Sequence, residues 1–245
     1  MLKGKKVYAI VPVRGGSKGI PRKNLYRLGK DTLLERTIKL GKACRYVDQV
    51  VVSTDDPEMF EIAKRYGVSA PSLRPSHLAT DAAKTVDVVL DLMTQMHIGD
   101  AYILLLQVTS PLRVIDDLDE LMKAFQANAD KADAIVSLTA HDDPHPDKIQ
   151  KIENGYVRSY LGVESMVPRQ FLPKVYRLNG AFYLTHSNVL VQQQTFMPKR
   201  TLPFLMPKER SVNLDGIMDL YLLEALVERK IIEIEEYSLD LPQQA

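Results

Sequence analysis

The chain has 245 residues, of which 45% are apolar and 26% charged, and its formal net charge is +1. This length and composition fit one large globular α/β domain that can bury a substantial core. A net charge near zero gives no reason to expect a nucleic-acid-binding protein or adsorption to an acidic membrane. Any anion site must therefore be local.

No apolar run approaches the roughly 20 residues needed to span a bilayer. The first residues show no apolar leader, so a cytoplasmic protein is expected. The single cysteine, Cys44, excludes an intramolecular disulfide and a Cys-rich metal site. Cys44 falls in a segment with helical spacing of apolar residues, which favours a packed thiol over a nucleophile.

A β-branched apolar run at residues 7–13 ends abruptly in a loop with three glycines and four cations. Such a run predicts a strand covered on both faces. Glycines let backbone N–H groups approach phosphate oxygens, and Arg14, Lys18, Arg22 and Lys23 supply counter-charge. The loop fits neither a Walker A motif nor G-x-G-x-x-G. On spacing alone, an anion site and a solvated basic loop both stay open.

Strand-like and helix-like segments alternate along most of the chain, which predicts an α/β fold with a mainly parallel sheet. Further strands are expected at residues 49–53, 102–106, 134–138, 179–184 and 231–235. Helices are expected at about 32–44, 57–66, after a Thr80-Asp81 cap, 116–127 and 217–229. The segment 102–106 is the most apolar and is expected at the centre of the sheet.

Residues 141–180 interrupt this alternation. Two short strand-like segments flank Glu153-Asn154-Gly155, which is a hairpin signal. A hairpin inserted into an α/β pattern usually projects from the sheet, either as an oligomer contact or as a surface loop. The prevalence of two-fold homo-oligomers favours a dimerisation arm. The expected organisation is a single domain over residues 1–245 with 141–180 as the inserted arm.

Polar clusters follow several of the expected strands. They comprise the basic loop at 14–24, Asp55-Asp56 and the segment 107–113, while Asn213 and Asp215 precede the last long helix. Ligands of open parallel sheets bind at the carboxyl ends of the strands. Cations and backbone amides on one side and oxygen donors on the other suit a nucleoside triphosphate with Mg²⁺.

Five stretches in this order carry a family resemblance: RGGSKGIPRKNL at 14–25, LLQVTSPLR at 105–113, RQ at 169–170, NGAFY at 179–183 and NLDGIMD at 213–219. Together they resemble the acylneuraminate cytidylyltransferases (CMP-sialic acid synthetases), including legionaminic and pseudaminic acid-type members. The resemblance implies a Rossmann-like nucleotidyltransferase fold, a three-layer sandwich, and a homodimer with interlocked arms. It also implies that CTP and a nine-carbon α-keto acid sugar give CMP-sugar and pyrophosphate, with Mg²⁺ or Mn²⁺.

The resemblance also implies roles for individual residues. The nucleotide-side contacts would be Arg14, Gly15, Gly16, Ser17, Lys18, Lys23, Asn24, Arg74, Thr85 and Gln107. The sugar-side contacts would be Gln107, Arg169, Asn179 and Tyr183. Asp215 and Asn213 match the metal position, and catalysis is expected from Arg14, Lys18 and Asp215. The alternatives are a solvated Lys23, an Arg169 held in a structural ion pair, and a Tyr183 that belongs to the core.

Two positions depart from the family pattern. Many members carry Asp-Ile-Asp where this chain has Asn213-Leu214-Asp215, and the neutral Asn213 weakens the case for a second protein-bound metal. Val108 replaces a usual proline, which alters loop stiffness more than chemistry. Asp219, one helical turn beyond Asp215, is expected to support or cap rather than to bind metal.

The expected reaction is in-line attack by the sugar's anomeric C2 hydroxyl on the α-phosphorus of CTP, driven by positioning and charge neutralisation. The sequence shows no convincing general base, so activation of the hydroxyl by a metal is the default hypothesis. The alternatives are a cytidylyltransferase for an eight-carbon keto acid, another sugar nucleotidyltransferase, or a non-catalytic nucleotide-binding protein on this fold. The sequence carries no local signature that selects among nine-carbon acids.

Overall fold

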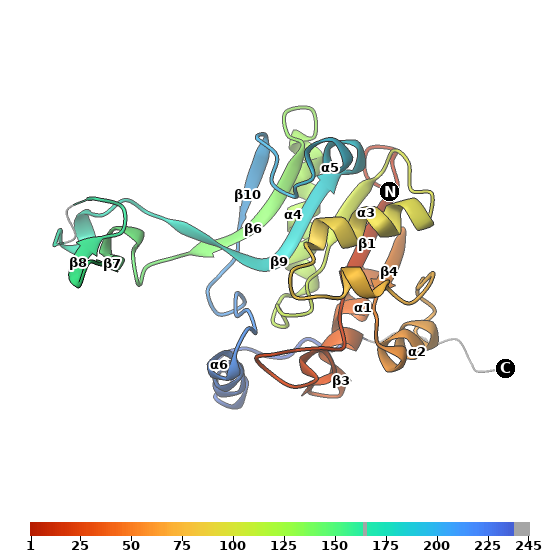
Figure 1. Cartoon of the computed structure of the whole chain (residues 1–245). Coiled ribbons are helices and arrows are strands. Elements are labelled where there is room, and N and C mark those ends of the chain that lie inside the picture. Colours follow the sequence, from red (N-terminus) through yellow and green to blue (C-terminus); the bar gives the residue numbers. More distant parts are fainter. Residues whose placement is uncertain (164–165, 238–245) are drawn as a thin grey trace.

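The computed structural model describes residues 1–163 and 166–237 and is built on a six-stranded sheet of order β10-β6-β9-β5-β1-β4 (Figure 1). Pairing is parallel except for β9, which runs antiparallel to both of its neighbours, β5 and β6. The strands are β1 Val7–Pro12, β4 Gln49–Ser53, β5 Tyr102–Leu105, β6 Ala134–Ala140, β9 Tyr176–His186 and β10 Thr201–Leu205. The expected mainly parallel sheet is confirmed, and β5 lies in its interior.

Helices cover both faces of the sheet. They are α1 Leu33–Ala43, α2 Pro57–Arg65, α3 Thr85–Gln95, α4 Ile115–Asn128, α5 Ser187–Gln193 and α6 Ile217–Glu228. Successive β1 residues alternate between two cores, because neighbouring side chains of a strand point to opposite faces. Ala9 and Val11 pack with α1, α2 and α4, whereas Ile10 packs with α3 and α5. The result is the expected three-layer arrangement.

Local signals in the sequence fix the ends of the first helices. Thr32 and Glu35 form a reciprocal capping box at the start of α1. Asp56 accepts hydrogen bonds from the first N–H groups of α2, and Gly67 follows that helix with a φ of +62°. Cys44 is buried at the end of α1, and burial raises the pKa of its thiol to about 11. This confirms the expected packed thiol.

The predicted hairpin is formed by β7 Gln150–Glu153 and β8 Tyr156–Ser159, and it projects away from the sheet beyond β6 and β9 (Figure 1). Asn154 and Gly155 form its turn with φ values of +53° and +80°. A second small ribbon, β2 Arg27–Leu28 with β3 Asp31–Thr32, follows the basic loop. No helix in the described ranges is long and apolar enough to cross a membrane.

Three expectations about individual elements are wrong. Residues 231–235 form no strand, because the N–H groups of Ile231 and Ile232 turn back to Leu226 at the end of α6. The segment instead packs Ile232 and Ile234 against the core. Strand β10 and helix α5 were not expected, and Pro203 disguises β10. A proline is tolerated there because β10 is an edge strand.

The third error concerns the start of α3. The helix begins at Thr85, and its N-cap residue, Lys84, makes no side-chain capping bond. Thr80 and Asp81 lie before the helix, where Asp81 contacts the basic loop instead. Threonine and aspartate are common N-caps, but this aspartate lies four residues before the helix begins and pairs with two cations instead.

Candidate active site

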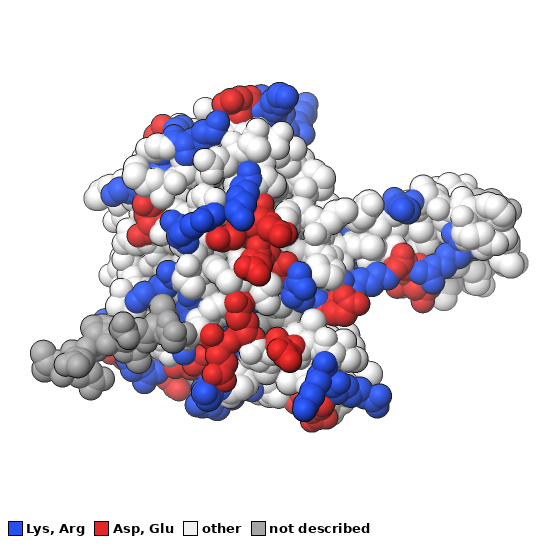
Figure 2. All heavy atoms as spheres, turned by 180° about the vertical axis from the view of Figure 1, so that it is seen from behind, with Lys and Arg blue, Asp and Glu red and all other residues white. Residues whose placement is uncertain are grey.

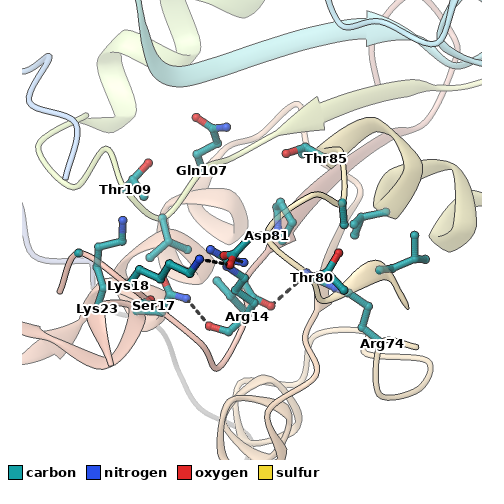
Figure 3. Close-up of a pocket in the computed structure, with 18 of the residues that line it drawn as sticks. Arg14, Ser17, Lys18, Lys23, Arg74, Thr80, Asp81, Thr85, Gln107 and Thr109 are labelled. Carbon is teal, nitrogen blue, oxygen red and sulfur yellow. Dashed lines mark hydrogen bonds and ion pairs between the residues drawn. The ribbon is translucent and has the colours of Figure 1, made fainter. Parts of the chain in front are cut away.

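A cavity of about 430 Å³ lies at the carboxyl ends of β1 and β5, and we call it the loop cavity. Side chains reach it from the loop after β1, the segment before α3 and the turn after β5 (Figure 3). Of the predicted residues, those that line it are Arg14, Ser17, Lys18, Lys23, Asn24, Arg74, Thr85, Gln107 and Asp215. The fold therefore brings together, around one cavity, predicted residues that lie far apart along the chain.

The backbone of the basic loop is tied down at several points. The N–H of Val13 donates to the Ser53 carbonyl at 2.9 Å, and the N–H of Gly15 donates to Asp55 Oδ1 at 3.0 Å. Buried Asn24 donates from Nδ2 to the Arg14 carbonyl at 3.0 Å. The Gly15 N–H is thus used for a hydrogen bond within the protein. Asn24, which was predicted to contact the nucleotide, uses its Nδ2 to hold the backbone of the loop.

Gly19 is where the loop meets the segment that carries the predicted metal residues. A Cβ at this position would lie 2.0 Å from the Asp215 carbonyl oxygen, so only glycine fits. Gly16, by contrast, is exposed and a Cβ there would meet no atom within 4 Å. The close approach at Gly19 places Asp215 next to the basic loop.

Lys23 and Arg74 are half-buried braces within the cavity wall. Lys23 Nζ donates to the Leu214 carbonyl, and burial lowers the pKa of Lys23, against the raising effect of nearby Asp215. A simple solvated lysine is therefore excluded. Arg74 donates from Nη2 to the Val13 and Ser53 carbonyls and from Nε to Ser53 Oγ at 2.9 Å. Burial lowers the pKa of Arg74, and its guanidinium joins the ends of β1 and β4.

Asp81 is a residue that sequence reasoning missed. Its Oδ1 lies 2.6 Å from Arg14 Nη1 and its Oδ2 lies 2.5 Å from Lys18 Nζ (Figure 3). Hydrogen bonds from Lys18 and Arg14 lower the pKa of the Asp81 carboxyl. The two cations expected at a triphosphate are thus bridged by a carboxylate of the protein. The sequence does show an acidic residue at position 81, but the Thr80-Asp81 pair was interpreted as the N-cap of a helix.

A second cavity, of about 560 Å³, lies at the root of the arm, and we call it the arm-root cavity. Asp215 lines both cavities. The other charged residues of its lining are Asp142, Asp143, Arg169, Arg177, Lys208 and Asp219. Arg169 Nη2 lies 3.6 Å from Asp142 Oδ2, and Lys208 pairs with the same oxygen. Arg169 therefore has the ion pair considered as its alternative role, yet it stays exposed at the cavity.

The predicted metal residues form a small cluster of oxygen atoms. Asn213 Nδ2 donates to Asp215 Oδ2 at 2.6 Å, while the buried Asn213 Oδ1 accepts no hydrogen bond from the described residues. Asp219 Oδ2 accepts from the N–H groups of Asp215 and Gly216 at 2.9 and 2.7 Å. The expected capping role of Asp219 is confirmed. Within the described ranges, no group of three or more His, Cys, Asp or Glu side chains could hold a metal.

Two predicted sugar-side residues lie deeper than expected. Asn179 is buried: its Oδ1 accepts from Ser137 Oγ at 2.6 Å, and its Nδ2 donates to Ser211 Oγ at 3.0 Å. Tyr183 is half-buried on β9 with its ring centroid 6.2 Å from that of Phe196, and burial raises its pKa. The structure thus brings Gln107 and Arg169 to the cavities, whereas Asn179 and Tyr183 line neither of them.

Gly180 explains why Asn179 is followed by glycine. Its φ is +76°, and a Cβ there would lie 2.7 Å from Gln107 Oε1 and 3.2 Å from Asn213 Oδ1. The backbone of β9 therefore approaches both side chains closely, which a larger residue would prevent. Asn179 supports this bend through its bonds, so its place in NGAFY has a structural reason.

Comparisons with known proteins identify relatives over nearly the whole chain. A family model described as "Cytidylyltransferase" matches residues 8–232. A CMP-N,N'-diacetyllegionaminic acid synthase of Legionella pneumophila is 27% identical over 91% of this chain and 97% of its own. A pseudaminic acid cytidylyltransferase of Campylobacter jejuni is 31% identical over 88% of this chain and 93% of its own.

The fold also has solved counterparts. The structure of a CMP:2-keto-3-deoxy-manno-octonic acid synthetase complexed with CTP matches with a TM-score of 0.67 and 16% sequence identity. The match covers 92% of this chain and 99% of that one. At this identity the likeness concerns the fold alone, and it confirms the expected Rossmann-like nucleotidyltransferase architecture.

Proposed function

The chain belongs to the cytidylyltransferase family, and from this premise we propose that it joins CTP to a nine-carbon α-keto acid sugar. The anomeric C2 hydroxyl of the sugar attacks the α-phosphorus of CTP, the bond to the β-phosphate oxygen breaks, and CMP-sugar and pyrophosphate form. The observation that carries this proposal is the meeting at Asp215 of two cavities: the loop cavity, whose lining has more cations than carboxylates, and the arm-root cavity, whose lining has three cations and four carboxylates. One cavity suits phosphates and the other suits an acidic sugar.

The nucleotide would lie in the loop cavity. Arg14 and Lys18 offset the charge of the phosphates, and Ser17 lines the same wall. Charge-assisted hydrogen bonds of this kind stabilise the growing negative charge on the leaving pyrophosphate. Thr85 and Gln107 face the opposite side of the cavity, toward the base, ribose or sugar (Figure 3).

Mg²⁺, or Mn²⁺, would be held between the cavities by Asp215 and Asn213. The exposed Asp215 carboxylate is an oxygen donor of the kind these ions prefer, so it fits the metal. Asn213 would have to turn its amide to bring Oδ1 to the same ion, because its Nδ2 faces Asp215 while its Oδ1 lies buried near Gly180. When bound, the metal would polarise the phosphate and the attacking hydroxyl.

The sugar would lie in the arm-root cavity, with its carboxylate facing the cations. Three cations, Arg169, Arg177 and Lys208, lie at this wall beside four carboxylates, and an α-keto acid would bind these cations through its carboxylate, which a neutral sugar lacks. Buried Asn179 would support this wall through its bond to Ser211 rather than bind the sugar directly, whereas Tyr183 packs with Phe196 in the core on the side of α3 and α5.

The arm would bind a second copy of the chain. Its exposed apolar side chains include Ile152, which is 82% exposed, and Phe171, which is 74% exposed. The outer part of the arm also shows few charged side chains on the face seen in Figure 2. Exposed apolar surface of this kind marks interaction sites, and a homodimer is the commonest solution.

We place the reaction in the cytoplasm, where CTP is made.

The test is a pyrophosphate-release assay with CTP, Mg²⁺ and a panel of acids. Neuraminic, legionaminic and pseudaminic acids and an eight-carbon keto acid are each incubated with the purified chain, and CMP-sugar is identified by mass spectrometry. We expect release with at least one nine-carbon acid, in equal amounts with CMP-sugar. CTP binding without release from any acid would contradict the proposal, and so would activity with the eight-carbon acid alone.

A further inference from the structure

The carboxylate of Asp81 occupies the position in the loop cavity at which an anionic ligand would meet its two cations. Each of its oxygens contacts a different cation, Arg14 at 2.6 Å and Lys18 at 2.5 Å. In Figure 3 the Lys18 side chain extends toward Asp81, and the carboxylate stands between the two cations. A phosphate offers the same cations the same kind of oxygen acceptors. Asp81 and a phosphate therefore compete for one position.

The segment that carries Asp81 can move without disturbing the core. Thr80, Asp81, Ala82 and Lys84 are exposed, and α3 begins only at Thr85. The backbone bond between the Ala83 N–H and the Thr80 carbonyl closes a local turn at 3.3 Å. The core of this region begins at Val88 and Val89, one turn into the helix. Leaving the cations costs Asp81 no buried contact.

Once phosphates are in place, a second negative charge at this position is unfavourable. Like charges at hydrogen-bond distance from shared cations repel each other and weaken each other's binding. Asp81 is 48% exposed in its side chain, so it can pass into water at little cost.

We propose that Asp81 is an internal competitor of the phosphates: it neutralises Arg14 and Lys18 in the free protein, and the bound nucleotide displaces it. This inference rests on the proposed function of the loop cavity. It makes Asp81 a determinant of nucleotide affinity. Ligands with more phosphate charge displace it better, and its return to the cations assists the release of pyrophosphate.

The test measures binding of inorganic pyrophosphate by calorimetry at low ionic strength, where screening is weak. Asp81→Asn is compared with Asp87→Asn, which removes the same charge from an exposed residue in the first turn of α3. We expect Asp81→Asn to bind pyrophosphate roughly fivefold tighter, because exposed ion pairs of this kind each alter an equilibrium constant by a small factor. Asp87→Asn should change the affinity less than twofold.

Unchanged or weaker binding by Asp81→Asn would overturn the inference. Lys18→Gln separates this failure from failure of the proposed function. If Lys18→Gln weakens pyrophosphate binding but Asp81→Asn does not tighten it, only the role of Asp81 falls. If Lys18→Gln has no effect, the loop is not a phosphate site and both proposals fall. Thermal unfolding of Asp81→Asn should match the wild type, since the residue is exposed.

Discussion

The loop cavity and the arm-root cavity both place cations near Asp215, but the fold holds those cations differently. In the loop cavity, Arg74 and Lys23 donate to backbone carbonyls of neighbouring segments, and Asn24 fixes the carbonyl of Arg14. In the arm-root cavity, Arg169 and Lys208 are exposed and share one carboxylate, that of Asp142. The first cavity is braced by bonds to the backbone at the ends of the strands, whereas the second is lined by exposed, ion-paired side chains at the base of a projecting arm.

The difference teaches where specificity can vary on this fold. The side chains of the loop cavity that bond to the backbone, Lys23 and Arg74, tolerate little change, because each bond positions a neighbouring segment. A wall of exposed side chains can be rebuilt without disturbing the sheet. This suits a family whose relatives are named for different acid sugars.

The largest expected effect comes from the residue common to both cavities. Among the described residues, Asp215 is the one carboxylate that lines both cavities, so Mg²⁺-dependent pyrophosphate release should fall at least about a hundredfold in Asp215→Ala. Glu209→Gln, an exposed acid in the segment before it, is the matched control and should keep near-normal turnover. Near-normal turnover in Asp215→Ala would show that the two cavities do not cooperate through this residue.

The second prediction concerns the backbone of the loop cavity at Gly19. Gly19→Ala would drive a Cβ into the Asp215 carbonyl, so the loop must shift, at a cost of about 1–3 kcal/mol in unfolding free energy. The KM for CTP should rise with it. Gly16→Ala meets open space and should change neither. Denaturant unfolding and steady-state kinetics on both variants check this, and equal behaviour of the two would contradict it.

The third prediction concerns the exposed wall. Arg169→Gln removes a cation facing the sugar and should raise the KM for the acid sugar about tenfold, leaving the KM for CTP and the unfolding free energy unchanged. Arg229→Gln, an exposed arginine at the end of α6, is the control. A parallel rise in the KM for CTP would mean that the two walls are not separable.

The smallest effect is a difference in pH dependence. Because burial lowers the pKa of Lys23 below 10.5, its positive charge is lost at a lower pH than that of an exposed lysine. Burial of the charged Lys23 ammonium lowers the free energy of unfolding, and this penalty disappears as the pH rises through the pKa of Lys23. The loss of the charge therefore does not destabilise the fold. The affinity for CTP, measured by calorimetry, should fall as the pH rises from 8 to 10. In Lys23→Gln the affinity should depend less on pH over the same range. An identical profile in both proteins would contradict the role of Lys23.

Much of the fold could be read from local signals. Continuous apolar runs predicted β1, β4 and β5, the helical spacing of apolar residues predicted α1, and the capping residue Asp56 predicted the start of α2. Elements whose sequence pattern depends on their place in the tertiary structure were harder to predict. Strand β10 contains Pro203, and residues 231–235 alternate like a strand yet wrap the core without pairing.

The candidate site was predictable where motifs are local and less so where roles depend on burial. The basic loop and Gln107 were found from their places after expected strands, and Asp215 from its place before the last long helix and from the family resemblance. No sequence pattern distinguishes a buried Asn179, which bonds to Ser137 and Ser211, from one that faces a ligand. Asp81 was missed because its partners, Arg14 and Lys18, lie more than sixty residues away along the chain.

The central claim is that CTP lies in the loop cavity with its metal at Asp215. A crystal structure of the chain with Mn²⁺ and a non-hydrolysable CTP analogue tests it most directly, because manganese is located by its anomalous scattering. The account predicts phosphate oxygens within hydrogen-bond distance of Arg14 and Lys18 and a manganese peak on the Asp215 carboxylate. Phosphates bound away from these cations, or manganese remote from Asp215, would contradict it.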